Sequence, residues 1–368
     1  LFRVTGYQVI PFDTILKFIW LREHAPEALD DADCWMMMPG LLSFLLCGER
    51  SIDPTAAGTM MAMDAAQRDW ADDILALAGL DASLFPAWVE PGELIGLPAG
   101  IPVVAAGHDT QFAAVGSGAG PGEAIVSSGT WEIAMTRQNS FQATREGFEE
   151  GLIIEADAEP GRWNPQLLMM GSGALEWIRE RFYGEIVARS EAYPTMIAEA
   201  EAVPAGAGGV TVLPSFVPDT GPTARHHTRG TVLGLGLGTS RAEVYRAGLE
   251  SLCFQLRHAL EIMDACTGLS VSGLRVVGGG AKNPLWNRLR ADITGLPVTT
   301  IANEEATVLG AAIFAFVGAG GLASVAEGQA AADLGEATIE PSADRGCYDE
   351  LYAAYRSLPP TLAEFYGR

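Results

Sequence analysis

One short segment of the sequence places an imidazole, a carboxylate and a hydroxyl in consecutive positions. Gly107-His108-Asp109-Thr110-Gln111 directly follows an apolar run. If that run is a strand, Asp109 lies at its carboxyl end, where α/β folds bind ligands, and could accept the proton of an attacking hydroxyl. Spacing alone favours a simpler interpretation, in which Asp109 only caps the helix that starts near Gln111. A lone histidine such as His108 is more often structural than a ligand.

Two glycine-containing turns could bring backbone N–H groups close to a phosphate. Ser127-Ser128-Gly129-Thr130 lies between two apolar runs, although an ordinary hairpin turn gives the same pattern. Gly278-Gly279-Gly280 leads from an apolar run towards Pro284, and a tight strand-to-helix turn is its alternative interpretation. The other glycine clusters do not form G-x-G-x-x-G between a strand and a helix, so a dinucleotide-dependent dehydrogenase is disfavoured.

The spacing of apolar residues predicts the elements that must position these segments. Compact apolar runs predict strands over residues 101–106, 124–128, 130–135, 209–213, 274–277 and 298–301. Helical spacing predicts helices over residues 14–24, 35–47, 67–79, 173–182, 194–203, 241–266 and 305–317, and one that begins at Pro284, whereas residues 86–100 are predicted to form a loop. Strands that alternate with helices indicate an α/β fold, with a domain boundary near Gly100.

Composition excludes several classes of protein. The 368 residues are 48% hydrophobic and 19% charged, which predicts about two folded domains. A formal net charge of -23 argues against a nucleic-acid partner, although local backbone groups can still hold a phosphate. Five cysteines without a C-x-x-C argue against a disulfide framework or zinc site and fit a reducing cytoplasm. The uncharged, apolar stretch of residues 34–48 is too short for a membrane span, so no membrane partner is expected.

Two longer patterns resemble the signatures of the FGGY carbohydrate kinases. The first is Phe12-x-Thr14-x-x-Lys17-Phe18-x-Trp20-Leu21-x-Glu23-His24. The second runs from Gly230-x-Val232-x-Gly234-Leu235 to Glu243-Val244-x-x-Ala247-Gly248-Leu249-Glu250, where Gly248 departs from the family pattern. The resemblance covers nearly the whole chain, and it favours the functional interpretation of the three segments over the simpler ones.

The resemblance implies an α/β, two-lobed actin-like ATPase (ribonuclease H-like) fold whose first lobe is incomplete at its N-terminus. Residues 1–100 would form the C-terminal part of the first, sugar-binding lobe, and residues 101–368 the second, nucleotide-binding lobe. The family's first phosphate loop, an Asp-x-Gly-Thr-Thr/Ser hairpin, is not found in the sequence. We therefore expect the natural protein to be longer; the alternative is a product that binds sugar or nucleotide without turnover.

The resemblance also implies a role for each segment. Asp109 would be the catalytic base and contribute to the Mg²⁺ site, with His108 and Thr110 beside the sugar. Gly129 and Thr130 match the second phosphate-binding turn. Positions that hold the phosphates, ribose and adenine of ATP in the family are matched by Gly230, Gly279, Gly280 and Asn283.

The expected substrate is a small ketose, phosphorylated by ATP on a terminal hydroxyl. The residues around His108–Thr110 and Trp131–Glu132 are most similar to family members that act on a six-carbon deoxyketose such as L-fuculose, with those that act on L-rhamnulose next. Another sugar or polyol is the alternative, and an actin-like ATPase without a sugar substrate is disfavoured by the signature at residues 12–24. The oligomeric state is left open, with a homodimer as one alternative.

Overall fold

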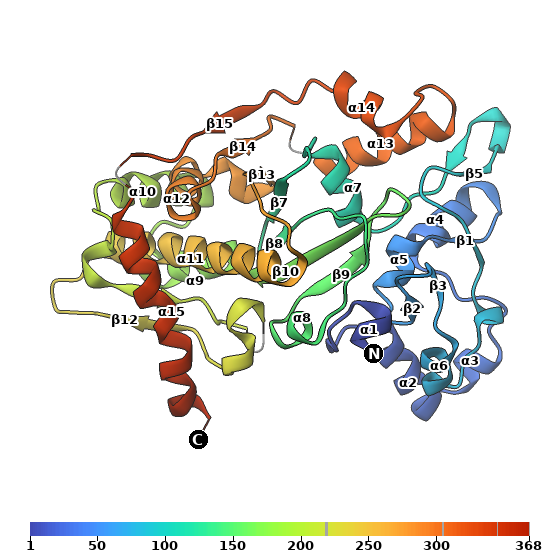
Figure 1. The fold of residues 1–368 in the computed structure, drawn as a ribbon, viewed down its shortest axis with the longest axis horizontal. Helices are drawn as coiled ribbons and strands as arrows, with labels where there is room; N and C mark the ends of the chain where they lie inside the picture. Colours follow the sequence, from blue (N-terminus) through green and yellow to red (C-terminus); the bar gives the residue numbers. More distant parts are fainter. Residues whose placement is uncertain (218–219, 304, 344, 368) are drawn as a thin grey trace.

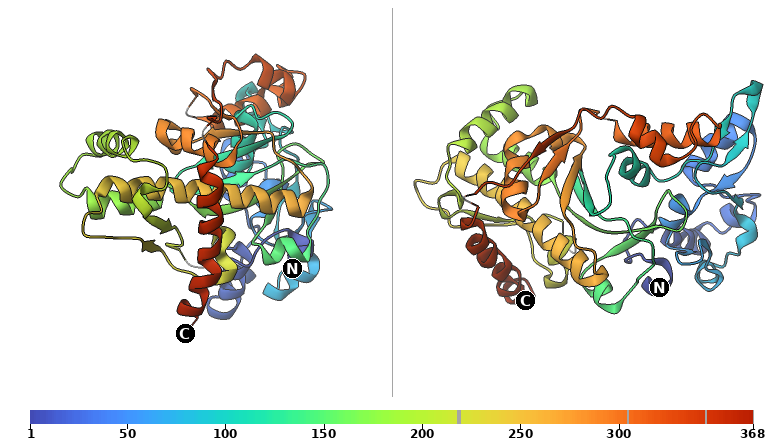
Figure 2. Two further views of the ribbon diagram at one scale, coloured as in Figure 1. Left: turned by 60° about the vertical axis from the view of Figure 1, so that its left-hand side comes forward. Right: turned by 45° about the horizontal axis from the view of Figure 1, so that its top comes forward.

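The computed structural model describes residues 1–217, 220–303, 305–343 and 345–367, and these form two parts (Figure 1). The first part is mostly helical and is built from the beginning of the chain. The second part surrounds a seven-stranded sheet with the order β15-β14-β13-β7-β8-β10-β9. The N-terminus lies at the junction of the two parts, and the C-terminus lies at the side of the second part away from the first (Figures 1 and 2).

The sheet of the second part is mixed. Four neighbouring strands form an antiparallel group: β7 (Glu123–Ser128), β8 (Trp131–Met135), β10 (Trp163–Met170) and β9 (Ile153–Ala156). Two strands continue the sheet parallel to β7, and a last one is antiparallel: β13 (Gly273–Val277), β14 (Val298–Thr300) and β15 (Ala337–Ile339). Antiparallel strands β7, β8 and β10 beside the parallel strands β13 and β14 match the ribonuclease H-like arrangement that the resemblance implies.

A long helix, α11 (Arg241–Thr267), covers one face of this sheet. Ser240 and Glu243 form a capping box at its start, and Gly268 ends it in the left-handed conformation with φ 70°. Its buried side, which includes Leu256, packs with Val126 of β7 and Leu274 of β13. Local caps and an apolar face therefore explain why the sequence predicts this helix to within one residue.

Two further helices, α7 (Asp109–Gly116) and α13 (Ala306–Gly318), cross in backbone contact at the junction. A β-carbon at Gly116 would overlap the carbonyl oxygen of Ala306, and one at Gly310 would overlap that of Phe112. Glycine is required at this crossing because any side chain would push the two helices apart. The crossing fixes the direction of α7, whose first residue is Asp109.

The first part has its own core around Phe18, Met60 and Leu75. Its elements are α1 (Phe2–Thr5), α2 (Thr14–His24), α3 (Glu27–Asp30), α4 (Met38–Cys47), β1 (Ser51–Ile52), α5 (Pro54–Gly58), β2 (Met63–Asp64), β3 (Asp69–Trp70), α6 (Asp72–Leu75), β4 (Ala87–Trp88), β5 (Leu94–Gly96) and β6 (Val103–Val104). The remaining elements of the second part are α8 (Arg145–Glu149), α9 (Ser172–Phe182), α10 (Arg189–Glu201), β11 (Thr211–Leu213), β12 (Thr231–Leu233), α12 (Pro284–Thr294), α14 (Val325–Ala331) and α15 (Cys347–Tyr366). None of these described helices is both long and apolar enough to cross a membrane.

Three sequence-based predictions are wrong. Residues 101–106 do not form a strand of the large sheet: only Val103–Val104 is extended, and it pairs with β5. Pro102 lacks a donor for a ladder hydrogen bond, and Ile101 is 67% exposed. Residues 67–79 are not one helix, because Arg68 has a positive φ of 56° and forms the turn between β2 and β3. Residues 86–100, predicted as a loop, contain β4 and β5.

Candidate active site

Asp109 is the first residue of α7, and its side chain is largely free to meet a ligand. The carboxylate is 76% exposed. Its Oδ1 accepts hydrogen bonds from the backbone N–H of Thr110 at 2.7 Å and from Nδ1 of His108 at 2.9 Å. His108, not Asp109, occupies the N-cap position, and no side chain caps this helix. Asp109 is therefore not the helix cap that spacing alone favoured.

The first part of the molecule holds the backbone next to Asp109 in place. The Oγ1 of Thr55 accepts a hydrogen bond from the backbone N–H of His108 at 2.8 Å. A β-carbon at Gly107 would overlap the side chains of Asp53 and Thr55, so only glycine allows this approach. Asp53 in turn caps α5, accepting from the N–H of Thr55 at 2.9 Å and of Ala56 at 3.2 Å. The start of α7 is thus fixed by residues more than fifty positions earlier.

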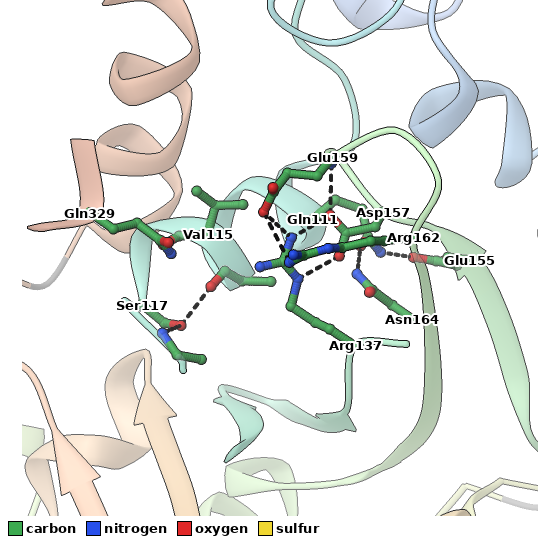
Figure 3. A network of polar contacts seen from close by, with 12 residues as sticks. Gln111, Val115, Ser117, Arg137, Glu155, Asp157, Glu159, Arg162, Asn164 and Gln329 are labelled. Atoms are coloured by element: carbon green, nitrogen blue, oxygen red, sulfur yellow. Dashed lines mark hydrogen bonds and ion pairs between the residues drawn. The ribbon is translucent and has the colours of Figure 1, made fainter. Parts of the chain in front are cut away.

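A buried polar network lies behind His108. The carboxylate of Glu155, on β9, accepts hydrogen bonds from the hydroxyl of Tyr7 and the amide of Gln111. Gln111 also accepts from the amide of Asn164 on β10 (Figure 3). Nε2 of His108 lies 3.7 Å from Oε1 of Glu155. The imidazole therefore stands between a buried carboxylate and the exposed one of Asp109.

The charges around His108 set the protonation of the pair. Burial alone would lower the pKa of His108, but the negative charges of Glu155, Asp109 and Asp53 outweigh it and raise this pKa to about 9. The hydrogen bond from His108 lowers the pKa of Asp109 to about 2, against the opposing effect of partial burial. Burial raises the pKa of Asp53. At neutral pH the pair is an imidazolium beside an ionised carboxylate.

The turn at Ser128–Thr130 packs closely against the start of α9. The N–H of Ser172 donates to the carbonyl of Gly129 at 2.8 Å, and the N–H of Gly171 donates to the carbonyl of Thr130 at 3.1 Å. A β-carbon at Gly171 would lie 2.7 Å from the carbonyl oxygen of Gly129. The turn that the sequence singled out is therefore a rigid one.

The glycine loop after β13 meets the same turn. Gly278 has a φ of 85°, and a β-carbon there would lie 2.7 Å from the carbonyl oxygen of Ser128. A β-carbon at Gly280 would overlap the Ser128 hydroxyl, whereas one at Gly279 would meet nothing within 4 Å. Ser128, next to Gly129 and Thr130, thus contacts Gly278 and Gly280, and the approach to the backbone at Gly279 is open. Such an opening suits a phosphate or a ribose.

The other two predicted nucleotide contacts are placed differently. Asn283 caps α12, accepting from the N–H of Trp286 at 3.1 Å, and its amide donates to the hydroxyl of Tyr245 at 3.1 Å. The Asn283 side chain is thus already hydrogen-bonded within the protein. A β-carbon at Gly230 would lie 2.6 Å from the ring of Phe216, which places Gly230 beside β12 with no described contact to the glycine loop.

Sequence reasoning also missed or misplaced several residues. Glu132, in one of the segments on which the expected substrate rests, is 1% exposed and forms an ion pair with the fully buried Arg290 below the Ser128 turn. Ser128 donates to Glu132 at 2.7 Å and accepts from Arg290 at 2.7 Å. This network supports the turn from below and does not face a ligand. The partners of His108, Asp53 and Glu155, were missed because only the docking of the two parts brings them to it.

A divalent metal ion would find a single carboxylate here. No group of three or more histidine, cysteine, aspartate or glutamate side chains arranged to hold a metal occurs within the described ranges. Mg²⁺ commonly uses one or two carboxylates together with water and substrate phosphates. The exposed Asp109 fits that pattern, provided that phosphate oxygens complete the coordination.

Known proteins are similar to this chain in both sequence and fold. The model of the FGGY family of carbohydrate kinases, N-terminal domain, matches residues 1–116, and that of the C-terminal domain matches residues 124–319. L-fuculokinase from Salmonella typhi is 36% identical over 338 residues, 89% of this chain and 69% of the relative. Autoinducer-2 kinase from Escherichia coli (strain K12) is 30% identical over 348 residues, 89% of this chain and 64% of the relative. The crystal structure of xylulose kinase from Rhodospirillum rubrum superposes with a TM-score of 0.87 at 25% identity, covering 100% of this chain and 75% of the other.

Proposed function

The chain belongs to the FGGY family of carbohydrate kinases, and from that premise we propose that it transfers the terminal phosphoryl group of ATP to the O1 hydroxyl of a small ketose such as L-fuculose. Asp109 is the base of this reaction. The observation that carries the proposal is the exposed carboxylate of Asp109, fixed at the start of α7 by Thr110 and His108.

Proton removal accounts for the role of Asp109. As the sugar oxygen bonds to the γ-phosphorus and the bond to the bridging β-γ oxygen breaks, the hydroxyl proton passes to the carboxylate of Asp109. The imidazolium of His108 keeps that carboxylate ionised and oriented before the sugar binds. Because His108 and Thr110 flank Asp109, both would also lie beside the bound sugar and hydrogen-bond its hydroxyls. A bound Mg²⁺ would neutralise the phosphate oxygens, and Asp109 is the residue that would contact it or its water shell.

The glycine turns are proposed to hold the nucleotide. The turn that holds Gly129 and Thr130 meets the loop of Gly279 and Gly280 through Ser128, and backbone N–H groups in such turns bind phosphates without a positively charged side chain. This point matters for a chain whose net charge is -23. Asn283 and Gly230 remain candidates for the ribose and adenine. Asn283 would have to contact the nucleotide while still capping α12.

The choice of ketose rests on the relatives. The relatives named L-fuculokinase are 34–36% identical to this chain in sequence, whereas the relatives named autoinducer-2 kinase are 30% identical to it. L-Rhamnulose is the next candidate substrate, followed by another sugar or polyol. A polar site that matches one arrangement of hydroxyls rejects others strongly, because its own groups would be left unpaired.

The test is an assay of phosphoryl transfer from Mg·ATP to a panel of ketoses and polyols, carried out with the natural full-length protein. We expect kcat/KM for L-fuculose or L-rhamnulose to exceed the values for glycerol and D-xylulose by at least about a hundredfold. A preference for glycerol would overturn the proposed substrate. Saturable sugar binding without any turnover would overturn the proposed transfer itself.

A further inference from the structure

A cavity lies at the opposite end of α7 from Asp109. Its volume is about 480 Å³, within the range of roughly 300–1,000 Å³ that is usual for small-molecule sites. The segments that line it are around residues 118–123, 136–139, 159–162, 269–271 and 326–329. Because α7 is eight residues long, or roughly 12 Å at about 1.5 Å per residue, this cavity is separate from the site at His108 and Asp109.

The charged side chains on the cavity wall have partners of opposite sign. Glu159 accepts hydrogen bonds from Arg137 at 2.7 Å and from Arg162 at 3.3 Å (Figure 3), and Glu123 pairs with Arg275 at 3.2 Å. An anion would have to displace Glu159 from the two arginines, and a cation would meet the guanidinium groups. Separating a partly buried ion pair is costly, so the wall disfavours an ionic ligand.

The same wall offers many groups to a neutral ligand that both donates and accepts hydrogen bonds. The side chain of Arg162 is 42% exposed, and a guanidinium has more N–H groups than the contact with Glu159 uses. Thr136 has a buried hydroxyl without a hydrogen-bond partner among the described residues. Other polar and apolar side chains alternate around the wall, namely Asn139, Ser270, Gln329, Leu269, Val271 and Ala326. This mixture matches the hydroxyl and C–H groups of a sugar.

Hydrogen bonds hold two walls of the cavity in place. The amide of Gln329, on α14, donates to the carbonyl of Val115 at 2.7 Å, which ties α14 to the last turn of α7 (Figure 3). Below the opposite wall, Arg137 holds Asp157 through two hydrogen bonds of 2.6 Å. The walls are thus fixed before any ligand arrives, which lowers the entropic cost of binding.

We propose that this cavity is a second small-molecule site, distinct from the site at Asp109, and that it takes a neutral polyhydroxylated compound of monosaccharide size, a free sugar or a polyol. Glu159 and Arg162 orient the ligand by accepting from and donating to neighbouring hydroxyls. Leu269, Val271 and Ala326 contact its C–H groups.

Hydrogen–deuterium exchange measured by mass spectrometry tests the proposal, because it localises binding. We expect L-fuculose and xylitol to protect peptides that span residues 118–123 and 159–162 in a saturable manner, and sodium sulfate to give no protection there. Ala326 is exposed on α14 at the cavity wall, so Ala326→Phe should fill the cavity without disturbing a core. This variant should weaken the protection by at least about tenfold in apparent Kd. Ala353→Phe, at an exposed position of α15, is the matched control and should leave it unchanged.

Three results would overturn the proposal. Protection confined to peptides around residues 53–55 and 107–112 would mean that only the site at Asp109 binds polyols. Protection by sulfate but not by polyols would reject the ligand class. Unchanged protection of residues 118–123 in folded Ala326→Phe would reject the location. Since exchange is measured without turnover, each result is independent of whether Asp109 acts as a base.

Discussion

Asp109 is held by contacts that an amide could largely reproduce, so its charge can be tested separately from its shape. Asp109→Asn keeps an acceptor for the N–H of Thr110 but removes the basic carboxylate. Because the side chain is 76% exposed, we expect no loss of folding.

If Asp109 is the general base, kcat should fall by about 10²–10⁴-fold, and sugar affinity should fall less. The measurement is kcat at saturating sugar and Mg·ATP, with thermal melting as the control for folding. A folded variant that keeps more than about a tenth of wild-type kcat would exclude Asp109 as the base.

Asp13 predicts a pH dependence of stability. It is 1% exposed. Burial raises its pKa from 3.8 to about 6, with opposing effects from the hydrogen bond donated by the N–H of Ile10 and from Lys17. The folded protein therefore binds this proton more tightly than the unfolded chain does, and stability is lost as the pH rises from about 4 to 6.

Replacing Asp13 removes that dependence. Relative to the wild type, Asp13→Asn should gain stability across this pH window, by up to about 2–3 kcal/mol, and the gain should level off above about pH 6. Urea denaturation of both proteins between pH 4 and 8 measures the difference. A difference that does not change with pH would show that Asp13 ionises as readily in the folded protein as in the unfolded one.

Among the elements, the loop after β13 contains neighbouring glycines with opposite structural demands. A β-carbon at Gly279 meets nothing within 4 Å, whereas one at Gly280 would overlap the hydroxyl of Ser128 and lie 3.0 Å from the ring of Trp286. We expect Gly279→Val to fold normally and to weaken ATP binding by at least about tenfold, since the valine would occupy the approach to the nucleotide. Calorimetric titration with ATP is the measurement.

The control for that experiment is Gly280→Val in the same loop. This substitution should lower the melting temperature, because the new side chain meets a buried serine and a tryptophan. An unchanged ATP affinity in folded Gly279→Val would remove the glycine loop from the nucleotide site. Equal destabilisation by both substitutions would show that Gly279 is needed for the fold instead.

How far the sequence predicts each element depends on whether its determinants are local. Helix α2 (Thr14–His24) is predicted without error because its apolar spacing lies within the segment. Helix α11 is predicted to within one residue because its apolar face and its caps are also local. The predictions for residues 67–79 and 101–106 are wrong because these segments pair with the short strands β2 and β5, and apolar spacing within a segment does not reveal such pairing. The same reason explains the site. His108, Asp109 and Thr110 form one contiguous motif, whereas Asp53 and Glu155 reach His108 only in the folded chain.

At the scale of the whole molecule, the two parts share their hydrophobic cores. Phe2 packs into the core of the sheet with Val126 and Met263, although it begins the chain. Conversely, Ile153 and Ala156 of β9 belong to the core of the first part. The domain boundary near Gly100 remains a prediction, but contacts of this kind couple the two parts wherever the boundary falls. They also keep Thr55 and Glu155, on opposite sides of the junction, in place around His108.

This sharing predicts that both parts unfold in one cooperative transition. Phe2→Ala removes a ring that is 6% exposed. Although Phe2 packs in the core of the sheet and not in the core of the first part, its loss should destabilise both parts together, by about 3–5 kcal/mol. Differential scanning calorimetry should show a single transition, moved to lower temperature. Phe365→Ala, at a position that is 68% exposed on α15, is the control and should leave the transition unchanged. If the two parts unfolded independently, Phe2→Ala would instead split the transition in two, and only the part that contains the sheet would melt at a lower temperature. The junction between the parts could then not hold His108 next to Glu155.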